Sequence, residues 1–185
     1  MEVLEPRNGE PSDLPTHRLK VEPAWIDTNN HMNAAYYTVA VKDAALYAHD
    51  TWDYGDDFRI RTGESNFVVD TQVIYLRELL LGAGLLVRTR ILSVEEKRMS
   101  LLFEIFNDDL DYLAALVRYR VIHVRLGPPP RAAAIPSPLR RRLEMVRESH
   151  AKLPLPPGHE RFRSSFSEDT RMSAPRGWVT RGERE

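Results

Sequence analysis

Runs of apolar residues with two different periods define the first elements of the chain. The segment "HRLKVEPAWI" (17–26) alternates weakly between apolar and polar positions, which predicts a short strand that ends near Pro23. From Asn33 the pattern changes, because "NAAYYTVAVKDAALYAHDTW" (33–52) has no Gly or Pro and is apolar on nearly all sides. We therefore expect a long helix that is buried over most of its surface and has Asn33 as its N-cap.

The middle of the chain predicts four strands. After a short turn or helix in "YGDDFRIRTGES", four segments alternate with period two (65–79, 85–96, 98–108 and 111–126). "EEKR" and "NDDLD" are suitable hairpin turns, and we expect the four strands to form a meander. In the first of these strands the alternation places five residues on one face: Phe67, Val69, Thr71, Val73 and Tyr75.

A helix that is apolar on nearly all sides needs a sheet to cover it. The predicted fold class is therefore α+β, with one antiparallel sheet against the long helix. Several strand positions that point away from this helix are arginines. This pattern predicts that the second face of the sheet is solvated or meets a partner; the residues concerned are Arg88, Arg90, Arg118 and Arg120.

A proline-rich boundary separates the predicted domain from a C-terminal extension. Eight of the 13 prolines fall between Pro128 and Pro157, and such a segment is stiff and extended. We expect a flexible leader at 1–15, a domain at 16–126, and a Pro-rich linker with an amphipathic helix at 127–155 that packs on the domain or on another subunit. Residues 156–185 are expected to be disordered.

Composition excludes several classes of protein. The chain has no cysteine, so disulfides and thiolate chemistry are excluded and a structural zinc site is not expected. The N-terminus lacks the features of a signal peptide and no run approaches ~18 apolar residues, so we expect a cytoplasmic protein without a membrane partner. Residues 127–185 contain 12 basic and 7 acidic side chains, and with so many acids among the bases nucleic acid is not an expected partner.

The stretch "DTNNHMN" places several reactive side chains at the entrance of the long helix. A helix N-terminus presents unpaired N–H groups and favours negative charge. Asn29 and Asn30 tolerate positive φ, so a tight turn could return the Asp27 carboxylate to those N–H groups. Asp27, His31 and Asn33 would then suit attack on a carbonyl. The alternative interpretation is purely structural: an Asx turn, a packed loop histidine and a helix cap.

"DTNNHMNAAYY" resembles the D-x-x-G-H-x-N-x-x-Y signature of hotdog-fold acyl-CoA thioesterases of the 4-hydroxybenzoyl-CoA thioesterase kind. The resemblance implies a sheet wrapped around one long helix, and a catalytic carboxylate at Asp27 that acts as general base or nucleophile. His31 and Asn33 would orient the loop or the thioester, and backbone N–H groups of Asn33 and Ala34 would hold the oxyanion. The glycine of the signature is Asn30 here, and because Asn is the next-best residue for positive φ, we expect the turn to survive at a small cost.

Three longer segments are similar to the thioesterases associated with carnitine degradation, which are thought to hydrolyse betainyl-CoA: "VEPAWIDTNNHMNAAYY", "VVDTQVIYLREL" and "RRRLEMVRESHAKLPLP". The resemblance implies a small polar acyl-CoA as substrate, a homodimer or dimer of dimers, and neither a metal nor a cofactor. A second subunit would complete the site with Asp70 and Thr71, and the strand arginines would meet the nucleotide phosphates. The expected substrate-binding residues are Trp25, Tyr36, Phe67, Asp70 and Thr71.

Two other functions are compatible with the same fold. The first is an acyl-CoA-binding protein without catalysis, such as a ligand sensor. Sensors of that kind usually carry a DNA-binding module, and the short acidic N-terminal segment has no room for one. The second is a hydratase or dehydratase, which would need a different arrangement of Asp and His.

Overall fold

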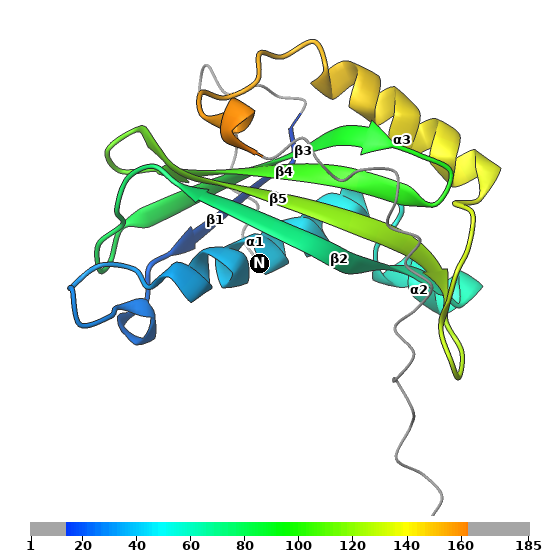
Figure 1. Ribbon diagram of the computed structural model, residues 1–185, viewed down its shortest axis with the longest axis horizontal. Helices are drawn as coiled ribbons and strands as arrows, with labels where there is room; N and C mark the ends of the chain where they lie inside the picture. The colour runs from blue at the N-terminus through cyan, green and yellow to red at the C-terminus, as the bar shows by residue number, and fades with distance from the viewer. Residues whose placement is uncertain (1–13, 163–185) are drawn as a thin grey trace, which may run out of the picture.

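One antiparallel sheet and three helices make up residues 14–162, the part of the chain described by the computed structural model. The sheet has six strands in the order β1-β3-β4-β5-β2, and β6 pairs with β5 (Figure 1). The strands are β1 (Thr16–Lys20), β2 (Glu64–Tyr75), β3 (Gly84–Val94), β4 (Arg98–Asn107), β5 (Tyr112–Arg125) and β6 (Arg131–Ala132). The helices are α1 (Ala34–Thr51), α2 (Asp56–Thr62) and α3 (Ser137–His150), with short 3-10 turns η1 (Pro23–Trp25) and η2 (His159–Arg161).

The four long strands all exist as predicted, but they do not form one meander. β3, β4 and β5 are joined by hairpins, whereas β2 pairs with β5 and the chain then crosses the sheet to β3. Alternation reveals that a segment is a strand but carries no information about its neighbour. The crossing places β2 at one edge of the sheet and β1 at the other.

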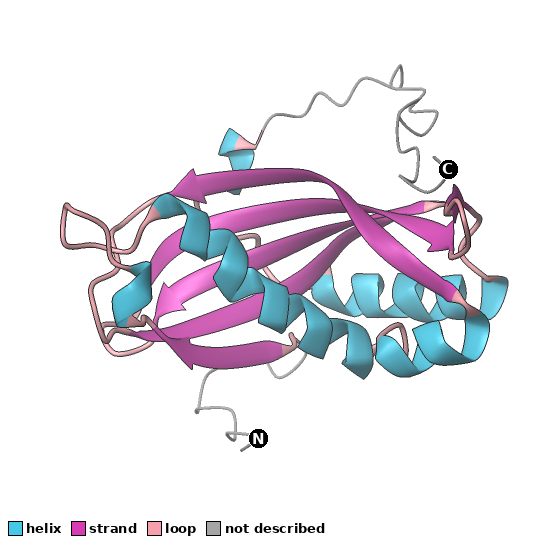
Figure 2. Cartoon of the chain, turned by 90° about the horizontal axis from the view of Figure 1, so that it is seen from below, coloured by secondary structure: helices cyan, strands magenta, loops and turns pink. Residues whose placement is uncertain are grey.

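α1 lies across one face of the sheet, which we call the inner face (Figure 2). The residues that it buries recur at helical spacing: Tyr37, Ala40, Val41, Ala44 and Ala48. The prediction of a helix buried over most of its surface is wrong in part, because Val39 is 43% exposed and Leu46 is 57% exposed. These two residues lie on the side of α1 that faces away from the sheet, together with Lys42.

A β-bulge in β2 divides the residues that the alternation put on one face. Val68 pairs with Val121 and Asp70 with Arg120, so Val69 is an extra residue between them. Directly paired residues share a face, and Val121 belongs to the core beneath α1. Thr71 and Val73 therefore point to the inner face, whereas Phe67 points to the opposite, outer face. The five-residue face predicted from alternation is thus wrong at Phe67.

α3 packs on the domain of its own chain, one of the two possibilities left open by the sequence. The pairing of β1 with β3 ends at Arg88, and α3 lies against the remainder of β3. The ring Nδ1 of His150 accepts a hydrogen bond from the Ile91 N–H at 3.0 Å. The helix thus satisfies a strand N–H that β1 does not reach.

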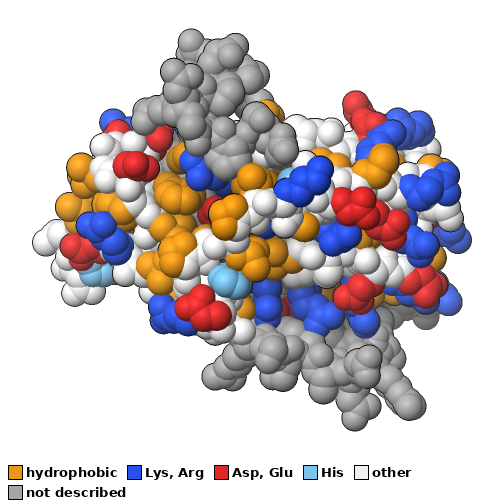
Figure 3. Space-filling model, turned by 90° about the horizontal axis from the view of Figure 1, so that it is seen from above, with side chains coloured by type: hydrophobic (Ala, Val, Ile, Leu, Met, Phe, Trp, Pro, Cys, Tyr) orange, Lys and Arg blue, Asp and Glu red, His pale blue; other side chains and the backbone are white. Residues whose placement is uncertain are grey.

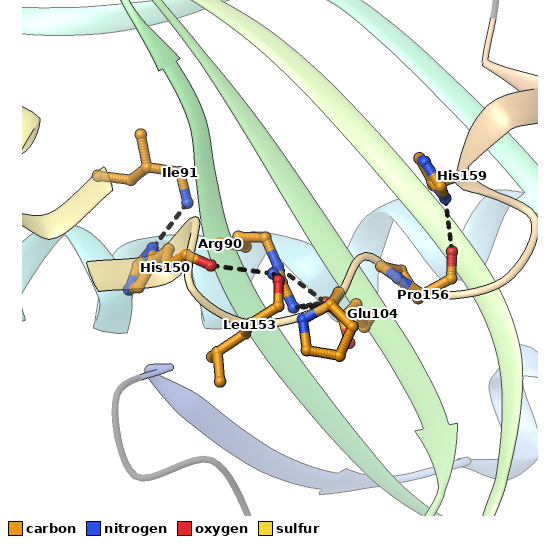
Figure 4. A network of polar contacts seen from close by, with 8 residues as sticks. Arg90, Ile91, Glu104, His150, Leu153, Pro156 and His159 are labelled. Atoms are coloured by element: carbon orange, nitrogen blue, oxygen red, sulfur yellow. Dashed lines mark hydrogen bonds and ion pairs between the residues drawn. The ribbon is translucent and has the colours of Figure 1, made fainter. Parts of the chain in front are cut away.

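Arg90 ties the end of α3 to the outer face of the sheet (Figure 4). Its Nε and one terminal nitrogen donate to Glu104 Oε1, at 3.2 and 3.0 Å. The terminal nitrogens also donate to the carbonyl oxygens of His150, Leu153 and Pro154. Burial raises the pKa of Glu104, and Arg90 opposes that shift. All five N–H groups of Arg90 are used, so the expectation that it meets a nucleotide phosphate is wrong.

The segment after α3 covers part of the outer face, which Figure 3 shows from above as a mixture of apolar and charged side chains. Phe162 is buried against Ile74, Leu102 and Leu116, and Arg118 stacks on its ring at 5.0 Å. The expectation of disorder from residue 156 is therefore wrong as far as Phe162. The prediction rested on the polar composition of this segment and overlooked Phe162, whose ring packs on the outer face.

The predicted leader also ends earlier than expected. Leu14 is buried, and the Pro15 carbonyl accepts the Thr89 N–H at 2.9 Å, which extends the edge pairing of β1. The expectations for residues 1–13 and 163–185 lie outside the described residues.

Replacing Arg90 by methionine tests the buried ion pair. Arg90→Met removes the cation that donates two hydrogen bonds to the buried Glu104 carboxylate, and we expect the free energy of unfolding to fall by about 3–5 kcal/mol. The measurement is urea denaturation followed by circular dichroism, with exposed Arg141→Met on α3 as control. The double variant Arg90→Met/Glu104→Met should regain part of the loss, because no unpaired charge remains. Equal losses in the single and double variants would contradict this account.

Candidate active site

The stretch between β1 and α1 folds back on itself as a small hairpin. Ile26 and Met32 form an antiparallel bridge. On either side of it, the Asp27 N–H donates to the His31 carbonyl at 3.1 Å and the Asn33 N–H donates to the Trp25 carbonyl at 2.8 Å. The stretch therefore has a fixed shape up to the first residue of α1.

The turn of this hairpin depends on Asn30. The Asn30 N–H donates to the Asp27 carbonyl at 3.0 Å, and Asn30 has φ of 64°. This is the hydrogen-bond pattern of a three-residue hairpin loop whose last position is left-handed, a position usually filled by glycine. Asn is the residue type next best suited to it. The prediction that Asn30 can replace the glycine of the signature is confirmed.

Four of the predicted site residues share one side of the hairpin. Met32 is buried at the bridge, and its N–H donates to the Leu79 carbonyl at 2.7 Å. Because side chains alternate along paired strands, the neighbours of the Ile26–Met32 bridge point to the other side. These neighbours are Trp25, Asp27, His31 and Asn33. The sequence motif therefore becomes a cluster in space.

The Asp27 carboxylate is held in place but remains accessible. Its Oδ1 accepts the Asn29 N–H at 2.8 Å and lies 3.7 Å from His31 Nδ1. The structural interpretation as an Asx turn is thus correct for one oxygen. The other oxygen accepts no hydrogen bond from residues 14–162 in this structure. With side chains 21% and 36% exposed, Asp27 and His31 can both meet a ligand from solvent.

The helix end supplies one backbone donor, not two. Asn33 caps α1, since its Oδ1 accepts the Ala35 N–H at 2.9 Å. The Asn33 N–H is consumed by Trp25, so the expectation that it binds an oxyanion is wrong. The Ala34 N–H, at the first position of the helix, donates to no acceptor within the described part of the chain. Ala34 remains available for that role.

Aromatic rings surround the helix entrance. Trp25 and Tyr36 stack with ring centroids 5.5 Å apart and an interplanar angle of 16°. Tyr75 of β2 donates its hydroxyl to the Ala34 carbonyl at 3.1 Å and meets Tyr37 edge-on. Burial raises the pKa of Tyr37 to about 12, so this hydroxyl stays protonated. Tyr75 was not among the substrate-binding residues expected from the sequence, although the alternation placed it on the same face of the strand as Thr71.

The expected contributions from β2 divide between the two faces. Thr71 pairs with Tyr119, whose hydroxyl contacts the Thr38 carbonyl of α1 at 3.4 Å, so Thr71 lies on the inner face. Asp70 lies on the outer face because it alternates with its neighbour Thr71, and Phe67 lies there because the bulge at Val69 reverses the alternation before Asp70. They do not join Asp27 within one chain, so their role in substrate binding stays a prediction that depends on a second subunit.

The strand arginines lie on the outer face as well. Arg88 stacks on Phe106 at 4.6 Å, Arg118 stacks on Phe162, and Arg120 lies 3.9 Å from Glu95. All of these contacts are on the opposite side of the sheet from α1. The expectation that these side chains meet phosphates of a ligand held beside Asp27 has no support in this arrangement.

The cluster has the parts needed for attack on a carbonyl. A carboxylate with one free oxygen can take a proton from water or attack a carbonyl carbon itself. A helix N–H can accept the negative charge that develops on the carbonyl oxygen. His31 beside the carboxylate can donate a hydrogen bond to it or to a ligand.

Two proteins of known name are similar to this chain over most of its length. The betainyl-CoA thioesterase of Pseudomonas aeruginosa is 31% identical over 147 residues, which cover 78% of this chain and 91% of that protein. The L-carnitine dehydrogenase/betainyl-CoA thioesterase of Agrobacterium fabrum is 34% identical over 155 residues. Those residues cover 81% of this chain but only 31% of the Agrobacterium protein.

Among solved structures, a hypothetical protein of Staphylococcus aureus in complex with CoA has the same fold. It superposes with a TM-score of 0.68 at 24% identity, over 79% of this chain and 92% of that one. The predicted α+β hotdog fold is therefore confirmed, as is the resemblance to acyl-CoA thioesterases. Residues 21–143 match the thioesterase-like superfamily, and the chain belongs to that family.

Proposed function

We propose that the protein is an acyl-CoA thioesterase that hydrolyses betainyl-CoA or a similarly small, polar acyl-CoA to the free acid and CoA. The observation that carries the proposal is the accessible Asp27 carboxylate on the hairpin that ends at the unpaired Ala34 N–H. The similarity to the betainyl-CoA thioesterase of Pseudomonas aeruginosa supports the acyl group.

The reaction follows from the two groups. With Asp27 as general base, its free oxygen takes a proton from water while the water oxygen forms a bond to the thioester carbon. The Ala34 N–H stabilises the oxyanion, and the C–S bond breaks as the CoA thiolate leaves. With Asp27 as nucleophile, its oxygen forms a mixed anhydride that water then hydrolyses. Both routes use the same residues.

In this proposal His31 and Asn33 orient the reacting groups and take no part in bond making or breaking. His31 lies beside the carboxylate, and Asn33 holds both the helix cap and the Trp25 carbonyl. The alternative, an acyl-CoA-binding protein without catalysis, would need a ligand site at the helix entrance but no free carboxylate oxygen. The accessible oxygen of Asp27 therefore favours the enzyme over the binder.

A homodimer through β2 is part of the proposal. β2 is an edge strand, and its exposed apolar residues Phe67, Val68, Val69 and Tyr75 would be costly to leave in water. Thr71 and Tyr75 of the same strand lie on the inner face, so a second subunit would bring residues near the helix entrance. The expected dimer of dimers has no separate observation in its favour.

We also propose a cytoplasmic location, which the lack of cysteine supports. No helix among the described residues is long and apolar enough to span a membrane.

Asp27→Asn tests the catalytic carboxylate. The amide cannot act as base or nucleophile, so kcat for thiol release from betainyl-CoA should fall by about 10²–10⁴-fold without a change in thermal stability. Asp43→Asn, an exposed carboxylate elsewhere on α1, is the control and should be fully active. Full activity of Asp27→Asn would refute the assignment, and binding without turnover by the wild type would establish the non-catalytic alternative.

Substitutions at Asn30 test whether the left-handed turn presents Asp27. Asn30→Gly should keep both stability and thiol release, because glycine adopts positive φ freely. Asn30→Val should lose about 1–2 kcal/mol of stability and most activity, since a β-branched side chain is strained there. Thr28→Val, in the same exposed turn, is the matched control. Retention of wild-type activity by Asn30→Val would mean that the turn geometry does not matter.

Val68→Asp tests the dimer. Val68 is 50% exposed on β2, and a charge buried there in an interface would go unpaired. Sedimentation velocity should give a dimer for the wild type and a dimer dissociation constant raised at least about tenfold for the variant. Leu110→Asp, in the exposed turn between β4 and β5, should remain dimeric. A monomeric wild type, or an unchanged Val68→Asp dimer, would exclude β2 as the interface.

A further inference from the structure

The stacked pair of Trp25 and Tyr36 lies directly beside the candidate carboxylate. Trp25 is two residues before Asp27 on one arm of the hairpin, and both side chains project to the same side of it. The repeat of an extended chain separates such residues by about 6.6 Å. Trp25 and Tyr36 are both half-buried, so their rings are partly open to a ligand.

Because Tyr36 stacks on one ring face of Trp25, a ligand would meet the other face or the ring edge of this half-buried side chain. Tyr36, in the first turn of α1, covers its face at a centroid distance of 5.5 Å. Tyr36 in turn is fixed by the helix, because its N–H donates to the Asn33 carbonyl at 3.0 Å. Tyr37 offers no comparable face, since it is buried and meets Tyr75 edge-on. Trp25 is therefore the ring best placed beside Asp27.

A quaternary ammonium group has no N–H with which to make hydrogen bonds. It is recognised by aromatic faces within about 6 Å and by nearby carboxylates. In a betainyl thioester the charged nitrogen is joined to the carbonyl carbon through one methylene. From the N–Cα–C dimensions of the peptide chain, the two atoms are about 2.5 Å apart. A carbonyl positioned for attack by Asp27 therefore carries the ammonium to within reach of Trp25.

We propose that the half-buried ring of Trp25, held by Tyr36, binds the quaternary ammonium of the acyl group and makes the site prefer cationic over neutral acyl groups. This inference rests on the proposed thioesterase function and adds a specificity determinant to it. Trp25 contacts the substrate, and Tyr36 is a positioning residue that acts through Trp25.

The test compares two acyl groups of the same shape. Betainyl-CoA and 3,3-dimethylbutyryl-CoA differ in the replacement of the charged nitrogen by carbon, and thiol release gives kcat/KM for each. In Trp25→Leu the ratio of the two values should fall by about 3- to 30-fold, mainly through a higher KM for betainyl-CoA. Trp25→Phe should keep part of the preference and Tyr36→Leu should lose some of it. Tyr47→Leu, a ring on α1 that packs near His17, should change nothing.

A binding measurement separates this inference from the proposed function. Calorimetric titration with glycine betaine and with 3,3-dimethylbutyrate needs no turnover, and the preference for betaine should depend on Trp25 in the same way. If no acyl-CoA is hydrolysed but betaine binding still needs Trp25, the function is wrong and the ammonium site stands. The ammonium site is refuted if Trp25→Leu lowers kcat/KM for both substrates by the same factor. It is also refuted if the variant leaves the ratio of the two kcat/KM values and the affinity for betaine unchanged.

Discussion

The closure of the hairpin onto the first residue of α1 is the constraint on which the candidate site depends. Two backbone hydrogen bonds fix it: Asn33 to Trp25 next to the helix, and Met32 to Leu79 next to the sheet. Without them, a helix end would have several unpaired N–H groups and a loop free to move away from it. With them, the N–H groups of Asn33, Ala35 and Tyr36 are all hydrogen-bonded within the chain. The Ala34 N–H donates to no acceptor among the described residues and could bind a ligand. The same hydrogen bonds that cap α1 therefore also hold the candidate site residues in place.

The path of the sheet explains why β2 reaches this helix end. Because the chain crosses from one edge of the sheet to the other after β2, the crossing segment passes the hairpin and Leu79 can anchor it. The same crossing leaves Tyr75, the last residue of β2, against the Ala34 carbonyl. A meander would have put β2 beside β3 and removed both contacts. Strand order, more than any single side chain, therefore builds the surroundings of Asp27.

Local patterns in the sequence predicted local structure well. The N-cap at Asn33, the left-handed Asn30 and the limits of α1 depend on nearby residues, and all three were predicted. The errors came from long-range effects. The bulge at Val69 turns Phe67 away from the inner face, and it reflects pairing with β5 that alternation within β2 cannot register. Likewise, the sequence predicted a solvated or partner-facing side chain at Arg90. The carbonyl groups that it bonds lie about sixty residues later in the chain, where no local pattern could indicate them.

Glu104 and Asp27 are two carboxylates that the fold places in opposite environments, one suited to a structural role and the other to the proposed catalytic role. Glu104 is buried and Arg90 is its paired cation, so its charge is committed to holding α3 and the following segment. Asp27 has only a backbone N–H and a histidine beside one oxygen, and it stays open to solvent. An oxygen that is already bonded is a poor base, so the Asx turn that holds Oδ1 directs reactivity to Oδ2. The turn therefore leaves Oδ2 as the oxygen without a hydrogen bond from residues 14–162, the one that the proposed reaction needs.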